Sequence, residues 1–249
     1  MQWFARALFD IAIRCNGMST TWGGKHGLTI GEENFLERLL GPTKGGVFFD
    51  VGANHGAYAR RLRALVPAAQ IYAFEPHPRT FATLKAMTEL DGAILINRAL
   101  SDQSGDMMLY DLGGHDGSTQ ASLSRKAVEL FSPTVVEHRV ACTTIDIFMK
   151  EQGVERIDLL KIDTEGFDLA VLKGAQDALS AGRIGTIQFE FIPANIMTGV
   201  RIRDFIQLLQ GHRLHRLCMN GSLIPIEPYE VTRSEIYAIQ NIIAVPRTK

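Results

Sequence analysis

VFFDVGANHG, residues 47–56, is an apolar run that ends in an acid and two glycines, and a second such run, IYAFEP at 71–76, ends near Glu75. The two runs predict neighbouring parallel strands whose carboxyl ends lie at one edge of a sheet, where open α/β sheets bind ligands. Gly52 and Gly56 lack Cβ, so the chain can turn tightly into a helix and pass close to a ligand. The stretch therefore predicts a nucleotide-type cofactor site on a doubly wound α/β sheet.

The spacing of this motif distinguishes between cofactors. A dinucleotide site would read G-x-G-x-x-G, whereas this turn reads D-x-G-x-x-x-G, with Asn54 in place of the second glycine. Asp50 would repel a pyrophosphate and attract a cationic amino-acid ligand, and Glu75 can accept hydrogen bonds from a ribose diol. The pattern resembles motif I of the class I methyltransferases that use S-adenosylmethionine, whose methionine part carries an ammonium and a sulfonium. The simpler alternative is a glycine turn without a ligand, and Glu75 at the expected distance weighs against it.

Beyond the motif, strands and helices alternate as a parallel sheet requires. Two further strands, 106–110 and 135–142, interrupt the alternation and enclose a polar loop at 111–124, which is either a cover over the substrate or a disordered segment. Because the connection before the last strand is rich in proline, we expect that strand to lie antiparallel. The remaining strands are expected at 47–51, 70–74, 93–99, 157–162, 186–191, 213–219 and 239–245, and helices at 32–40, 57–66, 78–90 and 202–209, with another after Thr143.

A second strong signal is IDLLKIDTEGFD, residues 157–168, which predicts a buried strand followed by the acidic tip Asp163-Thr164-Glu165. Carboxylates that gather at a ligand-binding edge are costly unless a cation or a proton offsets their charge, so the cluster favours a functional site. The alternative is helix capping, in which Asp163 or Thr164 caps the next helix and Glu165 complements its dipole.

With these elements in order, the chain resembles the FkbM family of S-adenosylmethionine-dependent methyltransferases from Gly46 to the last strand. The motifs that carry the resemblance are DVGANHGAY, AFEPHP, NRALSDQSG, TTIDIF, IDLLKIDTEGFDLAVLKGA and a strand ending in FEF. The family implies a class I Rossmann-like sheet with an antiparallel terminal strand, and methylation of a hydroxyl on a sugar, glycan or natural product. It also implies the cofactor contacts, which are Asp50, Gly52, Asn54 and Gly56 for the methionine portion, Glu75 for the ribose, and Ala99, Leu100, Ser101 and Asp102 for the adenine edge, with Asp163 alongside.

An alcohol is a poor nucleophile at neutral pH, so methyl transfer to oxygen needs a positioned base or a metal that acidifies the hydroxyl. Asp163 is the first candidate for the base, Glu190 at the tip of a later strand is the second, and His115 in the polar loop is the third. Asp163, Glu165 and Glu190 could instead hold a hard cation such as magnesium, because oxygen ligands on adjacent strand tips suit it, although we favour a site without metal.

Composition limits the range of partners. The 249 residues carry a formal net charge of -1 with acids and bases interspersed, so neither nucleic acid nor an anionic membrane is an expected partner. No apolar window reaches the roughly twenty residues of a membrane span. Cys15, Cys142 and Cys218 are odd in number and widely spaced, which indicates buried thiols in the reducing cytoplasm.

The N-terminal residues 3–14 predict an amphipathic helix with a charged stripe of Arg6, Asp10 and Arg14. We expect this helix to pack on the domain or on a partner subunit, the latter giving a homo-oligomer, in preference to a membrane surface. A glycine-rich linker at 17–31 would then join the N-terminal part, 1–30, to a methyltransferase domain of 31–249.

Two other functions are compatible with a sheet of this kind. A nicotinamide-dependent (NAD-type) oxidoreductase acting on sugars would show G-x-G-x-x-G and a Tyr-x-x-x-Lys pair, and neither occurs in the sequence. A non-catalytic binding protein with this Rossmann-like fold would be expected to lose the acids at the strand tips, yet Asp50, Glu75 and Asp163 are all present. The sequence thus predicts an S-adenosylmethionine-dependent O-methyltransferase with a small-molecule or glycan acceptor.

Overall fold

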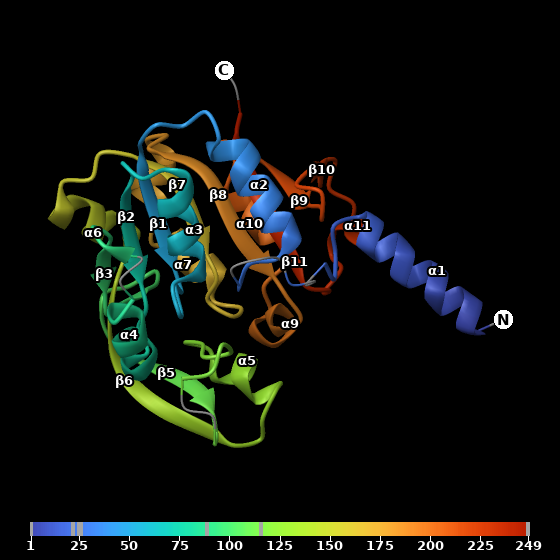
Figure 1. The fold of residues 1–249 in the computed structure, drawn as a ribbon. Helices are drawn as coiled ribbons and strands as arrows, with labels where there is room; N and C mark the ends of the chain where they lie inside the picture. The colour runs from blue at the N-terminus through green and yellow to red at the C-terminus, as the bar shows by residue number, and fades with distance from the viewer. Residues whose placement is uncertain (1, 21–22, 24–26, 88–89, 115–116, 248–249) are drawn as a thin grey trace.

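An eight-stranded sheet forms the centre of the computed structural model, which describes residues 2–20, 23, 27–87, 90–114 and 117–247 (Figure 1). The strand order is β10-β9-β11-β8-β7-β1-β2-β3. The five strands from β8 to β3 run parallel, and β11 lies antiparallel between β8 and β9, so the mostly parallel sheet with an antiparallel terminal strand is confirmed. The strands are β1 (Val47–Val51), β2 (Gln70–Phe74), β3 (Ile94–Ile96), β7 (Ile157–Ile162), β8 (Ile184–Phe191), β9 (His212–Leu217), β10 (Leu223–Pro225) and β11 (Gln240–Pro246).

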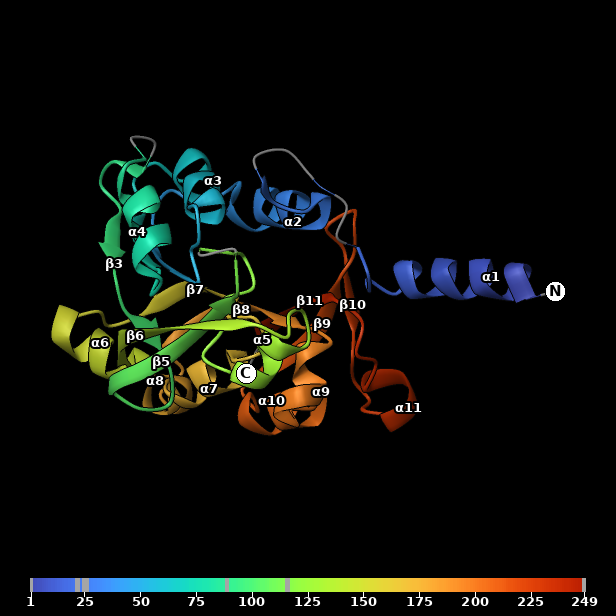
Figure 2. The ribbon, with the colours of Figure 1, turned by 90° about the horizontal axis from the view of Figure 1, so that it is seen from below.

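Helices cover both faces of this sheet, as Figure 2 shows. The cause is the two-residue repeat of a strand, which sends neighbouring side chains to opposite faces. In β1, Phe48 packs into one apolar cluster and Phe49 into the other. The cluster around Phe48 is covered by α2 (Ile30–Leu40), α3 (Ala57–Leu65) and α4 (Pro78–Lys85), and the cluster around Phe49 by α6 (Ile145–Gln152), α7 (Asp168–Lys173), α8 (Gln176–Ser180) and α10 (Ile202–Leu208).

The strand expected at 93–99 divides between two sheets. Its first part, β3, pairs with β2, while β4 (Ala99–Leu100) pairs with β6 (Val135–Thr143) in a three-stranded sheet that β5 (Gly105–Leu112) completes. Asn97 marks the division, because its side-chain amide donates to the carbonyl oxygens of Glu75 at 2.8 Å and Pro76 at 3.0 Å. The chain is thereby fastened to the end of β2 before it leaves the main sheet.

Most other boundaries agree with the sequence predictions to within two residues, and one helix is shorter. The helix expected at 78–90 ends as α4 at Lys85, and Leu90 reaches the same apolar cluster as Leu84 from the turns that follow. Three short helices complete the described chain, namely α5 (Arg125–Glu129), α9 (Ala194–Thr198) and α11 (Val231–Ser234).

The N-terminal helix α1 (Gln2–Cys15) extends away from the body of the molecule (Figures 1 and 2). None of its residues is buried, and Trp3 is 81% exposed. The expectation that this helix packs on the domain is therefore wrong, and so is the expectation of a buried thiol at Cys15, which is exposed, whereas Cys142 is buried and Cys218 half-buried. Across the described ranges, no helix has the length and apolar character needed to span a bilayer.

Candidate active site

The two motif glycines let β1 and α3 approach their neighbours closely. Gly52 has a φ of +78°, and a Cβ there would lie 1.9 Å from the carbonyl oxygen of Asp163 at the end of β7. Gly56 has a φ of +74°, and its Cβ would lie 2.6 Å from a methyl carbon of Leu84. Both positions therefore exclude other side chains. Gly52 brings the tips of β1 and β7 together, whereas Gly56 shapes the start of α3 and does not line either cleft described below.

Asp50 and Asn54 carry oxygen atoms that are buried without a partner. Asp50 is only 1% exposed, and burial raises the pKa of its carboxyl group to about 7 although the charge of Lys161 opposes the rise. Within the described part of the chain, neither Oδ2 of Asp50 nor Oδ1 of Asn54 has a hydrogen-bond partner. Buried acceptors without donors are costly, so the pair suits a ligand that brings N–H groups or positive charge.

Glu75 is held in place at the end of β2 by two backbone groups. Its Oε1 accepts from the amide of His77 at 2.8 Å, and its Oε2 accepts from the amide of Asn54 at 2.9 Å. Burial raises the pKa of Glu75 to about 7, against the effect of these two hydrogen bonds. Each carboxylate oxygen can accept more than one hydrogen bond, so a diol can still bind.

Two adjoining clefts open along this edge of the sheet. The first encloses about 580 Å³, counting space open to solvent, and contains Glu75 together with the apolar side chains of Phe74, Leu100, Leu109 and Leu123. The second, of about 1010 Å³ on the same basis, is lined by charged and polar groups that include Glu32, Asp50, Tyr58, Arg60 and Lys161. The clefts share Gly52, Asn54, Thr119, Asp163 and Glu165. The first cleft, which has an apolar wall, therefore continues into a charged one.

The adenine-edge residues expected from the family resemblance separate into two groups. Ala99 and Leu100 line the first cleft. Ser101 is fully buried behind them, where its hydroxyl donates to Asp102 at 3.0 Å, and neither Ser101 nor Asp102 reaches either cleft.

The acidic tip of β7 surrounds one buried ammonium group. Lys161 is 3% exposed, and its Nζ lies 3.0 Å from Oδ2 of Asp163. Burial alone would lower the pKa of Lys161, but the carboxylates of Asp163, Glu32 and Glu190 raise it above its ordinary value. Lys161 therefore supplies the positive charge that this group of acids requires.

Glu165 is, with Asp163, one of the two acids that line both clefts. Its φ of +51° lies in the left-handed region that residues with a side chain seldom adopt, and such strain is often found at functional sites. Burial, followed by the charges of Asp163 and Asp168, raises the pKa of Glu165 to about 8. Burial therefore favours the neutral form of Glu165, which can donate a hydrogen bond.

Glu190 lies behind this tip and does not line either cleft. Its Oε1 is 3.5 Å from the side-chain amide of Asn241, and burial raises its pKa well above the ordinary value. The structure thus brings Glu190 near Lys161 and Asp163 but leaves it outside both clefts. His115, the third candidate base, lies outside the described residues.

Helix capping does not explain the acidic tip. The N-cap residue of α7 is Phe167, and no side chain caps the helix there. Asp168 instead accepts from the hydroxyl of Thr164 at 3.0 Å and from the amide of Glu190 at 3.2 Å. The capping alternative is therefore wrong, because the turn at Glu165 and Gly166 separates Asp163 and Thr164 from the helix.

The loop between β5 and β6 closes against the first cleft. Asp111 anchors it, because its carboxylate accepts from the amides of Leu112, Gly117 and Ser118 at 2.7, 2.7 and 3.0 Å and also from the Ser118 hydroxyl. The hydroxyl of Ser122 donates to the carbonyl oxygen of Thr164 at 3.3 Å. Of the two readings of this loop, a cover fits its described residues, since Ser118, Thr119, Ala121, Ser122 and Leu123 all line the first cleft.

Several residues at the site were missed by sequence reasoning. Gln188 in β8 accepts from the hydroxyl of Tyr58 at 2.8 Å and donates to Glu32 and Asn241, each also at 2.8 Å. A glutamine in the middle of a buried apolar strand is a signal that could have revealed this network.

In the described ranges, no group of three or more His, Cys, Asp or Glu side chains is arranged to hold a metal ion.

Comparison with known proteins relates the chain to a family and to a fold. The family model for the methyltransferase FkbM domain matches residues 50–214. The 2-O-methyltransferase NoeI of Sinorhizobium fredii is 31% identical over 182 residues, which cover 68% of this chain and 72% of NoeI. The hexuronic acid methyltransferase AglP of Haloferax volcanii is 28% identical, over 74% of this chain and 70% of AglP. Among solved structures, the methyltransferase domain of METTL16 shares the fold, with a TM-score of 0.51 at 13% identity over 98% of this chain and 79% of that one.

Proposed function

Since this chain belongs to the methyltransferase FkbM family, which depends on S-adenosylmethionine, we propose that it transfers a methyl group to a hydroxyl oxygen of a sugar or small glycan. The names of two relatives support the acceptor class, because one is a 2-O-methyltransferase and the other is a hexuronic acid methyltransferase. The observation that carries the proposal is the pair of unpartnered buried oxygens on Asp50 and Asn54, which adjoin Glu75 and the apolar cleft.

The residues present fit this cofactor. Asp50 and Asn54 would accept from the methionine ammonium, Glu75 would accept from the ribose hydroxyls, and Ala99 and Leu100 would contact the adenine. Gly52 makes room between β1 and β7, while Gly56, Ser101 and Asp102 would act from behind the cleft wall by holding its shape. Three cysteines without disulfides suit the reducing cytoplasm that we propose for the enzyme.

When bound, S-adenosylmethionine supplies an electrophilic methyl group, so the protein has to align the acceptor oxygen and receive its proton. Asp163 lines both clefts, and Lys161 holds its Oδ2, which leaves Oδ1 to accept the proton of the hydroxyl. Glu165, in its neutral form, would orient the acceptor by donating a hydrogen bond. Glu190 would act through Lys161 rather than on the substrate.

Magnesium held by Asp163, Glu165 and Glu190 is the other arrangement that would activate a hydroxyl. We assign the compensating charge to Lys161 instead, because its ammonium group already lies 3.0 Å from Asp163 and is surrounded by the same acids.

Calorimetric titration with S-adenosylmethionine tests the cofactor site. The wild-type protein should bind the cofactor in the micromolar range, and Glu75→Ala should weaken binding by roughly tenfold to a hundredfold, since a hydrogen bond to a charged group contributes about 1.5–3 kcal/mol. Asp91→Ala, in an exposed turn remote from both clefts, serves as the control. Transfer of labelled methyl to sugar hydroxyls, measured on the same samples, tests the reaction. Absence of cofactor binding by the wild-type protein would overturn the proposal.

A further inference from the structure

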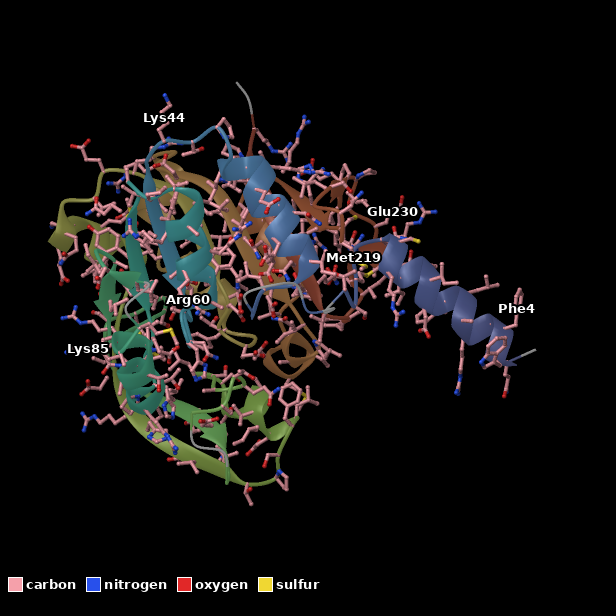
Figure 3. The ribbon with its side chains drawn as sticks, viewed as in Figure 1. Phe4, Lys44, Arg60, Lys85, Met219 and Glu230 are labelled. Atoms are coloured by element: carbon pink, nitrogen blue, oxygen red, sulfur yellow. The ribbon has the colours of Figure 1, made fainter. Side chains whose placement is uncertain are left out.

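One arginine in the charged cleft, Arg60, lacks an ion-pair partner among the residues that the structure describes. Arg60 lines the second cleft from α3, and Figure 3 shows it at the end of that helix nearest the turn from β1. Its Nε is enclosed without a hydrogen-bond partner, and no described residue forms an ion pair with it. Its neighbours differ, because Arg61 pairs with Glu33 at 3.4 Å and with Glu37, while Arg63 donates to the carbonyl oxygens of Pro67 and Ala69.

The other acids of the same cleft, apart from Asp50, are matched by neighbouring groups or favour the neutral form. Asp163 pairs with Lys161 at 3.0 Å. Glu32 accepts from the amide and hydroxyl of Thr29, each at 2.9 Å, and from Gln188 at 2.8 Å. Burial favours the neutral form of Glu165. Asp50 faces the position assigned above to the cationic part of the cofactor. A partly buried guanidinium group without an acceptor is unfavourable, so Arg60 is suited to an anion that arrives with a ligand.

We propose that Arg60 binds a carboxylate that enters the second cleft, and that this carboxylate belongs to an acidic sugar acceptor such as a uronic acid. The planar guanidinium group can donate two parallel hydrogen bonds to a carboxylate. Arg60 lines the charged cleft and not the apolar one, which places it on the side away from the nucleoside. The inference rests on the proposed function. The cofactor's own methionine carboxylate is the other source of the same chemistry, and the experiment has to separate the two.

The test compares binding of two sugars and two nucleosides by calorimetry. In the first experiment, the protein is saturated with S-adenosylhomocysteine and then titrated with glucuronate or with glucose. In the second, the free protein is titrated with S-adenosylhomocysteine or with 5′-methylthioadenosine, which lacks the amino acid. The variants are Arg60→Gln, Arg60→Lys and, as a control on the same helix with the same loss of charge, Arg61→Gln. Circular dichroism and thermal unfolding verify that each variant is folded, and Arg60→Lys provides a milder change should Arg60→Gln fail to fold.

We expect the wild-type protein to bind glucuronate at least tenfold more tightly than glucose. Arg60→Gln should remove this preference, Arg60→Lys should retain part of it, and Arg61→Gln should leave it unchanged. If Arg60→Gln instead weakens S-adenosylhomocysteine and spares 5′-methylthioadenosine, Arg60 binds the cofactor's carboxylate and the acidic acceptor is rejected. Unchanged affinity for all four ligands overturns the carboxylate site. If the wild-type protein binds neither nucleoside, the proposed function is contradicted. The role of Arg60 is then still decided by titrating glucuronate into the free wild-type protein and into free Arg60→Gln.

Discussion

At the scale of single residues, the site holds carboxyl groups where burial disfavours their charge. The pKa values of Asp50, Glu75 and Asp168 are each raised to about 7, chiefly by burial. A cationic ligand beside Asp50 would favour its ionised form again, because opposite charges at short range offset desolvation. The ligand-free protein thus keeps an unfavourable group in its core that becomes favourable when the cofactor binds.

Asp50→Asn should separate stability from binding. The rise in the pKa of Asp50 from 3.8 to about 7 lowers the free energy of unfolding by at most about 4 kcal/mol at high pH, where the buried carboxyl group has to ionise. Asparagine does not ionise, so the variant should unfold at a higher temperature than the wild-type protein at pH 8. Affinity for S-adenosylmethionine should fall at least tenfold, as measured by calorimetry. Asp106→Asn, which changes an exposed carboxylate, is the control. A variant with unchanged affinity would show that Asp50 does not face the cofactor.

The same raised pKa values set the direction of the pH dependence. The folded protein binds protons at Asp50, Glu75 and Asp168 more tightly than the unfolded chain, so their contribution to stability is largest at low pH. It is lost as the pH rises towards about 7, the value of these folded-state groups. The unfolding temperature of the ligand-free protein should therefore fall between mildly acidic and mildly alkaline pH, and it should fall less in Asp50→Asn.

Glu165→Gln tests whether the protonated acid orients the acceptor. Because the pKa of Glu165 is raised to about 8, the wild-type kcat/KM should decline as the pH rises through that value and the hydrogen-bond donor is lost. Glutamine keeps a donor at every pH, so the variant should lack this alkaline decline while retaining cofactor affinity. An identical decline in the variant would assign the ionisation to another group.

At the scale of elements, the loop between β5 and β6 depends on one carboxylate. Asp111 is fully buried, and the hydrogen bonds that it accepts hold its pKa below the ordinary value despite burial. These bonds join the end of β5 to Gly117 and Ser118, so the chain that follows is held against the first cleft. The described residues of the covering loop are thus fixed to the end of β5 by this carboxylate.

Asp111→Ala should loosen this loop without unfolding the sheet. Loss of the anchor leaves buried N–H groups unsatisfied, which costs about 1–3 kcal/mol locally. Hydrogen exchange of residues 117–123 should accelerate, and the affinity for S-adenosylmethionine should fall by roughly threefold to tenfold. Asp106→Ala, on the same strand but exposed, should change neither measurement. Unaltered exchange would mean that the loop is held by its contact with β7 instead.

At the scale of the whole molecule, α1 lies apart from the catalytic body. Its exposed side chains include Phe4, which Figure 3 labels near the outer end of the helix, and also Trp3, Leu8, Phe9 and Ile11. A helix that leaves apolar side chains exposed and has no buried residue is suited to a partner. Self-association through α1 is therefore the prediction that fits a helix with no buried residues.

Removal of residues 2–15 should leave the catalytic body intact. Because none of these residues is buried, the unfolding temperature should change by no more than about 2 °C, and cofactor affinity should stay the same. Sedimentation velocity should show a dimer for the full chain and a monomer for the truncated one. Equal sedimentation behaviour, corrected for mass, would exclude α1 as the contact between copies.

Local sequence patterns were sufficient to predict the strands, the glycine turn and the acids at the strand tips. Apolar periodicity predicts β1, β2 and β7 from the sequence alone. It also places three acids at the ends of these strands, namely Asp50, Glu75 and Asp163. The alternation of strands and helices correctly predicted that the core strands run parallel, and the proline-rich connection before the last strand correctly predicted that this strand lies antiparallel.

Contacts between distant segments required the folded molecule. Three features have no local signature: the approach of Glu32 and Glu190 to Lys161, the departure of β4 into a second sheet, and an Arg60 guanidinium that lacks an ion-pair partner among the described residues. Each depends on which side chains become buried together and how far apart their charges lie. Those quantities arise when strands separated by more than a hundred residues, such as β1 and β7, are brought side by side, and a pattern read along the chain does not contain them.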